Sequence, residues 1–120
     1  MQNFTKQLLS ESVDGIGFNI GNSRTLLHVP PQGTTTKDEV WLYAKNLLDK
    51  ENILQIMWAH EGEGAQFTIT CHLDALEGLK LVVPGLIVQN AKQVSAFCTE
   101  IDENLNYGVG IVGFVNRISE

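Results

Sequence analysis

The sequence is poor in cysteine and proline, with two and three of them in 120 residues. Two cysteines cannot build the dense cross-linking of small secreted scaffolds. So few prolines exclude a proline-rich disordered chain. Hydrophobic residues make up 43% of the chain, which is an ordinary fraction for a globular protein. We therefore expect a single domain over residues 1–120, built around one apolar core.

Long hydrophobic runs are also lacking. The longest, residues 79–88, is interrupted by Lys80, Pro84 and Gly85 and falls well short of a membrane span. The N-terminus shows no secretory signal, and the cysteines, Cys71 and Cys98, lie within apolar stretches. These features predict a cytoplasmic protein that contacts no membrane and keeps its thiols reduced and buried as small hydrophobic side chains.

Basic residues are scarce: eight Lys and Arg face 14 Asp and Glu, which gives a net charge of −6. Nucleic-acid binding is therefore not expected, because it depends on clustered cations that neutralise phosphates. The imbalance lies in residues 51–116, where eight acidic residues accompany only Lys80 and Lys92. Such an excess of one sign suits the electrostatic steering of a basic protein partner.

Motifs of catalysis and metal binding are missing as well. The chain has no G-x-S-x-G, no P-loop, no H-E-x-x-H and no paired C-x-x-C. Residues 108–113 spell G-x-G-x-x-G, but only seven residues follow them, too few for a dinucleotide-binding unit. We interpret this motif as a strand whose glycines let a helix approach closely. The sequence favours a protein without catalysis, metal or other cofactor, and leaves a minor activity open.

Alternating apolar residues predict two hairpins. In the first, residues 16–20 and 25–29 pair around Asn22-Ser23, which sets Phe18 opposite Leu27 and leaves His28 on the other face. In the second, residues 54–58 and 67–73 flank an acidic, glycine-containing turn. The pattern predicts three cross-strand pairs in this second hairpin: Leu54 with Cys71, Ile56 with Ile69, and Trp58 with Phe67.

Apolar residues at helical spacing predict two main helices. Residues 36–39 have the spacing of a capping box, and Val40, Tyr43, Ala44 and Leu47 follow as an inward stripe, which predicts a helix to about Lys50. Steps of four and three from residue 87 to residue 105 predict a long helix. Residues 4–9 predict a short helix, residues 80–83 a short strand, and residues 109–115 a final strand. The expected fold is α+β, with a mostly antiparallel sheet of five or six strands and both main helices on one face.

The sequence is compatible with three functions. The first is a non-catalytic module that binds a basic partner, such as an inhibitor, an immunity protein or a chaperone. Its predicted contact residues are the acids of the second half: Glu61, Glu63, Asp74, Glu77, Glu100, Asp102 and Glu103. The second is a ligand-binding domain or minor enzyme, with a pocket between the sheet and the long helix and with Trp58, His60 and Glu61 at its mouth. The third is a homo-oligomer that covers the mixed face around Ile53, Gln55, Met57 and Thr68.

Overall fold

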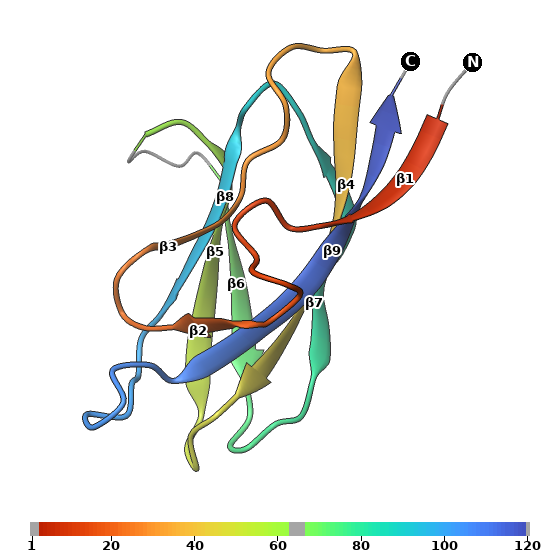
Figure 1. Ribbon diagram of the computed structural model, residues 1–120. Coiled ribbons are helices and arrows are strands. Elements are labelled where there is room, and N and C mark those ends of the chain that lie inside the picture. The colour runs from red at the N-terminus through yellow and green to blue at the C-terminus, as the bar shows by residue number, and fades with distance from the viewer. Residues whose placement is uncertain (1–2, 63–66, 120) are drawn as a thin grey trace.

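The protein, described here by a computed structural model, folds entirely from strands within residues 3–62 and 67–119, and these residues contain no helix. Figure 1 shows the strands as two facing layers. The strands follow each other along the chain as β1 (Asn3–Leu8), β2 (Phe18–Ile20), β3 (Thr25–His28), β4 (Thr36–Asn46), β5 (Asn52–His60), β6 (Phe67–Leu73), β7 (Lys80–Val88), β8 (Gln93–Cys98) and β9 (Val109–Ser119).

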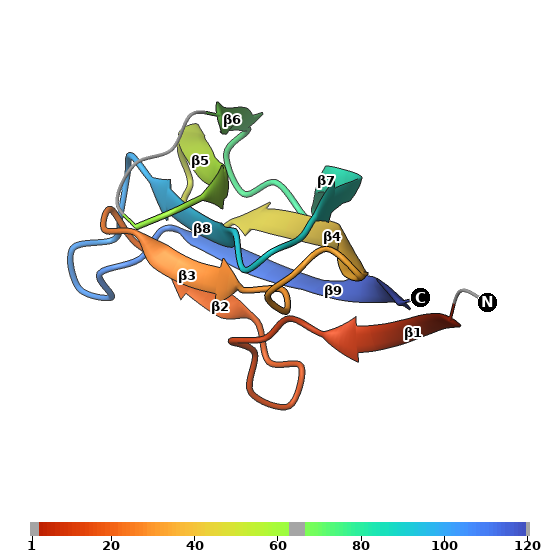
Figure 2. The same ribbon diagram turned by 90° about the horizontal axis from the view of Figure 1, so that it is seen from above.

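The strands form two antiparallel sheets by nested pairing. β5 pairs with β6, β4 with β7, β3 with β8, and β2 with β9, so the chain resembles one long hairpin that has been rolled up. The pairings of β4 with β9 and of β5 with β8 complete sheet A, in the order β1-β9-β4-β7, and sheet B, in the order β3-β8-β5-β6. This arrangement is the jelly-roll topology. Figure 2 shows the two sheets from above.

The core lies between the sheets and follows the two-residue period of strands. On β4 the inward side chains Val40, Leu42 and Ala44 are fully buried, and on β5 Leu54 and Ile56 are fully buried. The expected α+β fold with two main helices is therefore wrong. A sandwich buries one side of each sheet against the other, and this supplies the core without helices.

The residues predicted as the first main helix form β4. Residues 40–44 are all apolar. Trp41 and Tyr43 point outward, whereas their neighbours in the strand point inward, so both sides of β4 are apolar. A strand that is apolar on both faces loses its alternation and matches a helical stripe equally well. The predicted long helix is also wrong, because residues 87–105 belong to β7, β8 and the loops around them. The short helix of residues 4–9 is replaced mainly by β1.

The two predicted hairpins have opposite outcomes. The second is confirmed, with Leu54 opposite Cys71 and Trp58 opposite Phe67. The first is wrong, because β2 pairs with β9 in sheet A and β3 pairs with β8 in sheet B. A register shift between Leu26 and His28 also buries His28, which had been expected on the face away from the core. The final strand is confirmed as β9, and the short strand from residue 80 continues through Pro84 as β7.

Candidate functional site

Three loops meet at one end of the sandwich, the lower end in Figure 1, and together we call them the loop end. They are residues 47–51 between β4 and β5, residues 74–79 between β6 and β7, and residues 99–108 between β8 and β9. The loop end contains seven acidic residues and one lysine, so it carries a charge equal to the net −6 of the whole chain. The acids are Asp49, Glu51, Asp74, Glu77, Glu100, Asp102 and Glu103.

Two buried asparagines hold the loop end together. Asn46, the last residue of β4, donates from Nδ2 to the carbonyl oxygens of Lys50 and Asp74, both at 2.8 Å. Asn52, the first residue of β5, donates to the carbonyl oxygen of Glu100 at 2.9 Å and accepts the Glu100 N–H at 3.1 Å. The loops are thus fixed before any partner arrives, which lowers the entropy lost on binding. Neither asparagine was predicted as a site residue, although polar residues at the ends of apolar segments are visible in the sequence.

Ion pairs neutralise only part of the loop end. Lys50 pairs with Glu100 at 3.3 Å, and Lys80, the first residue of β7, pairs with Glu77 at 3.9 Å. Within the described residues, no ion pair forms at Asp49, Asp74, Asp102 or Glu103. The Asp102 carboxylate instead accepts the backbone N–H groups of Asn104 and Leu105. The carboxylates of Asp49, Asp74 and Glu103 are therefore exposed to solvent and stabilise no other described group.

Exposed leucines lie among these acids. Leu47, Leu76, Leu79 and Leu105 are between 37% and 65% exposed. Single apolar residues on a surface are ordinary, but four exposed leucines within one set of loops are more than isolated cases. The loop end therefore combines anionic and apolar groups on a fixed backbone.

The structure divides the predicted acidic surface. Asp74, Glu77, Glu100, Asp102 and Glu103 lie together at the loop end. Glu61 lies at the opposite end of the sandwich, beyond β5, and forms an ion pair with Lys92. Glu63 lies outside the described residues. Asp49 and Glu51, which the sequence reasoning had not selected, belong to the loop end.

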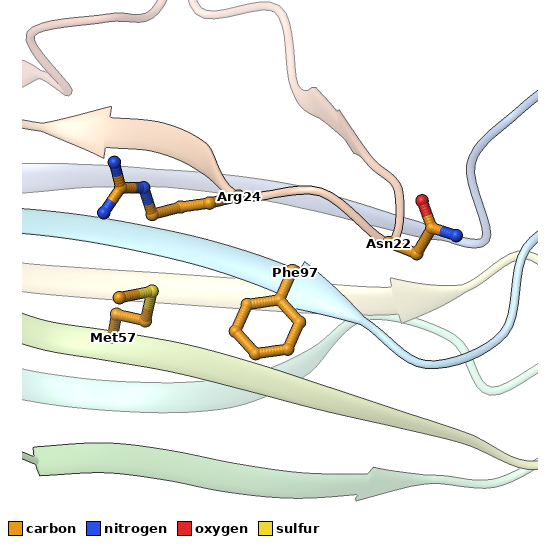
Figure 3. A pocket seen from close by; sticks show the side chains of 4 residues that line it. All are labelled: Asn22, Arg24, Met57 and Phe97. Carbon is orange, nitrogen blue, oxygen red and sulfur yellow. The ribbon is translucent and has the colours of Figure 1, made fainter. Parts of the chain in front are cut away.

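The alternative pocket was predicted between the sheet and a long helix, but the described residues contain no helix to cover the sheet. His60 is buried, with Nδ1 donating to the Gly62 carbonyl at 2.9 Å and Nε2 accepting from the Ser95 hydroxyl at 2.8 Å. Trp58 packs against the core and Glu61 pairs with Lys92. A shallow pocket of about 440 Å³ lies on sheet B, lined by Asn22, Arg24, Met57 and Phe97 (Figure 3).

A second buried histidine belongs to a network that joins the sheets. His28 Nε2 lies 2.6 Å from Asp38 Oδ2, and Arg117 donates two hydrogen bonds to the same carboxylate at 2.9 and 3.0 Å. The Ser10 N–H donates to His28 Nδ1, so the neutral ring carries its proton on Nε2. Burial raises the pKa of Asp38, but the hydrogen bonds from His28 and Arg117 and the charge of Arg117 outweigh it and leave the pKa below its usual value.

This network contains serine, histidine and aspartate, yet its geometry differs from a catalytic triad. The Ser10 hydroxyl accepts the Val29 N–H at 2.7 Å and forms no hydrogen bond to the histidine ring. His28 and Asp38 are fully buried, so no substrate reaches them. The network is a structural connection between β3, β4 and β9.

The described residues contain neither a metal-binding group of side chains nor a cysteine with the features of a reactive thiol. No group of three or more His, Cys, Asp or Glu side chains has the arrangement to hold a metal ion there. Cys71 is half-buried and Cys98 is buried, and burial raises the pKa of both thiols. This disfavours the reactive thiolate. The described part of the chain also contains no helix of the length and hydrophobicity needed to cross a membrane.

The glycine motif has the structural role that was predicted, with a different neighbour. Residues 109–113 lie in β9, and a Cβ on Gly113 would collide with the Trp41 carbonyl oxygen of β4. A Cβ on Gly108 would collide with the Glu100 carbonyl oxygen of the loop end. The glycines therefore allow a strand and a loop, rather than a helix, to approach closely.

The outer side of sheet A is a second candidate surface. One row of Cα partners crosses β1, β9, β4 and β7 as Leu8, Phe114, Trp41 and Pro84. The next row crosses β9, β4 and β7 as Val112, Tyr43 and Leu81. Both rows are wholly apolar, and the Trp41 and Phe114 rings stack with their centroids 6.2 Å apart. We call these seven residues the apolar face.

Lysines surround the apolar face. Lys6 on β1 lies over the Phe114 ring at 4.9 Å, and Lys37 and Lys45 point to the same side from β4. No ion pair forms at these three lysines within residues 3–62 and 67–119, whereas Lys50, Lys80 and Lys92 each pair with a glutamate. Among the described residues of the strands of sheet A, Glu39 is the one acidic side chain on this side, and its carboxylate accepts hydrogen bonds from Trp41 and Asn116.

Comparison of the chain with family models, with curated proteins and with solved structures finds no match.

Proposed function

We propose that this chain is a protein-binding module that uses its loop end to bind a partner with basic and apolar groups. The observation that carries the proposal is the composition of the loop end, where seven acids, one lysine and four exposed leucines lie on loops fixed by Asn46 and Asn52. Carboxylates would steer a basic partner, and leucines would supply apolar contact once it docks.

The roles of the buried histidines agree with binding rather than catalysis. Both ring nitrogens of His28 and of His60 have protein partners, and both side chains are buried. A cytoplasmic location is part of the proposal, and the two free cysteines support it, since thiols stay reduced in that compartment.

The test measures binding of a synthetic peptide of alternating lysine and leucine. The loop variant combines Asp49→Asn, Asp74→Asn and Glu103→Gln, three exposed side chains whose removal breaks no ion pair. We expect its affinity for the peptide to fall by about tenfold at low salt, mainly through a slower association rate.

A matched control changes the charge by the same amount at the other end. The substitutions Gln32→Lys, Thr34→Lys and Thr35→Lys, in the exposed loop before β4, also move the net charge from −6 to about −3. The control should bind the peptide nearly as well as the native chain. Equal loss in both variants would assign binding to net charge alone and would overturn the proposal.

A further inference from the structure

Among the described residues, most of the charges without ion pairs lie on two surfaces of the molecule, and Glu11 and Asp14, in the loop between β1 and β2, are exceptions. Within residues 3–62 and 67–119, the carboxylates without ion pairs at the loop end are those of Asp49, Asp74, Asp102 and Glu103. In the same part of the chain, the lysines without ion pairs are Lys6, Lys37 and Lys45, all beside the apolar face. The rest of the cations have partners inside the protein. The unpaired carboxylates of the loop end thus complement the unpaired lysines beside the apolar face.

Both surfaces also expose apolar groups. The loop end presents four leucines, and the apolar face presents two continuous rows that include Trp41 and Phe114. No described strand covers the outer side of sheet A (Figure 2). In an antiparallel sandwich the outer side of a sheet is normally polar, so an apolar outer side indicates a contact surface.

We propose that the chain associates head to tail with copies of itself, the loop end of one copy docking on the apolar face of the next. This inference rests on the proposed function, because it names the apolar face of a second copy as the basic and apolar partner of the loop end. A contact between two apolar faces is disfavoured by comparison, since it would bring the three unpaired lysines of each copy together.

The size of the contact predicts a weak association. The two shorter dimensions of the molecule are 27 and 22 Å, so its end offers a footprint of roughly 600 Å² at most. Two such footprints give about 1,200 Å² of buried surface, at the lower limit for specific complexes. The contact is heterologous, so it need not close after two copies, and larger chains form as concentration rises.

The test exchanges charges between the two surfaces. The loop-reversed variant carries Asp49→Lys, Asp74→Lys and Glu103→Lys, and the face-reversed variant carries Lys6→Glu, Lys37→Glu and Lys45→Glu. Sedimentation velocity would follow each protein from about 10 to 300 µM at about 20 mM salt. Thermal unfolding would first show that both variants keep the native fold.

We expect the native chain to grow in mass with concentration without levelling at twice its 13.3 kDa. Each variant alone should associate at least tenfold more weakly, because each then opposes like charges. An equal mixture should recover association, since the lysines of one variant meet the glutamates of the other.

Two outcomes would overturn the inference. A native chain that stays monomeric over the whole range would exclude self-association, while peptide binding at the loop end would still stand. A native dimer that the loop-reversed variant forms equally well would assign the contact to two apolar faces. If the peptide fails to bind the loop end but charge exchange restores association, the broader proposed function fails and the self-contact remains.

Discussion

The outer sides of the two sheets differ in one respect that matters for function. On sheet A, the row Leu8, Phe114, Trp41 and Pro84 is apolar across four strands. On sheet B, the corresponding rows alternate in character, as where Leu26, Ser95, Met57 and Thr68 follow each other across the strands.

The inner sides of both sheets pack into the same core, so the need for a core does not explain why only one outer side is apolar. A sheet needs only one apolar side to fold, and sheet B shows the usual solution of an outer side half-exposed to water. The apolar outer side of sheet A is therefore not required to form the core. The proposed contact with a second copy therefore uses the outer side of sheet A, rather than the mixed face of sheet B around Ile53 and Met57.

The largest predicted effect concerns the attachment of the two sheets to each other, on which the comparison of their outer sides depends. Asp38→Ala removes the carboxylate that binds His28 and Arg117 and leaves both without their buried partner. We expect the free energy of unfolding to fall by about 3–5 kcal/mol in urea denaturation. The control is Glu39→Ala, one residue along β4 on the outer side, which should cost about 1 kcal/mol or less. Similar losses would show that Asp38 does not hold the sheets together.

The next prediction concerns the close approach of β4 and β9, which aligns the rows of the apolar face. A methyl group at Gly113 would meet the Trp41 carbonyl oxygen and force these central strands apart, so Gly113→Ala should cost about 2–4 kcal/mol. A Cβ on Gly110, three residues earlier in the same strand, would lie 3.9 Å from its nearest neighbours, an ordinary contact distance. Gly110→Ala should change stability by less than about 1 kcal/mol. Guanidinium denaturation of both variants measures the difference, and equal values would contradict the steric explanation.

A smaller effect is expected from acid, which acts on the connection between the sheets. The pKa of Asp38 is lower in the folded protein than in the unfolded chain, where it is ordinary. Its contribution to stability is therefore complete above about pH 4 and is lost as the pH falls through the lower, folded value. Thermal unfolding between about pH 5 and pH 2 should show this loss. Asp38→Asn should remove that part of the pH dependence, and an unchanged profile would assign it to other carboxylates.

The smallest effect on stability comes from the surfaces themselves. Leu8→Ser with Leu81→Ser removes half-exposed side chains from the apolar face, and Ile53→Ser with Met57→Ser makes a matched change on sheet B. Each pair should cost about 1 to 2 kcal/mol at most. Binding of the fluorescent dye ANS, which reports exposed apolar surface, should fall by roughly half for the first pair and much less for the second. Equal decreases in ANS binding for the two pairs would show that the outer sides of the two sheets do not differ in exposed apolar surface.

The same distinction explains which strands the sequence could predict. In the hairpin of β5 and β6, apolar residues point inward while Gln55, Thr68 and Thr70 point outward, so the alternation fixed the correct register. β4 is apolar on both sides, and Thr36 and Glu39 at its start imitate a capping box, so a helix was predicted there. The property that hid this strand in the sequence, apolar residues on both of its sides, is also the reason why we propose its outer side as a contact surface.

The candidate surfaces were predictable only in part. The excess of acid in the second half was visible in the sequence, and five of the seven predicted acids do lie together at the loop end. The lysines beside the apolar face come from two strands, β1 and β4, that are joined only through β9 at the end of the chain. Their grouping depends on pairing over long sequence distances, which periodicity does not report.

The nested pairing of the strands has a consequence for how the protein is made. In β1, residue 3 pairs with residue 119, and β2 pairs with the start of β9. These two strands are therefore synthesised long before the strand with which they pair. Folding dominated by such distant partners is slow, on the order of milliseconds to seconds. During synthesis the unpaired N-terminal strands are open to aggregation, and chaperones that protect nascent chains should raise the yield of native protein.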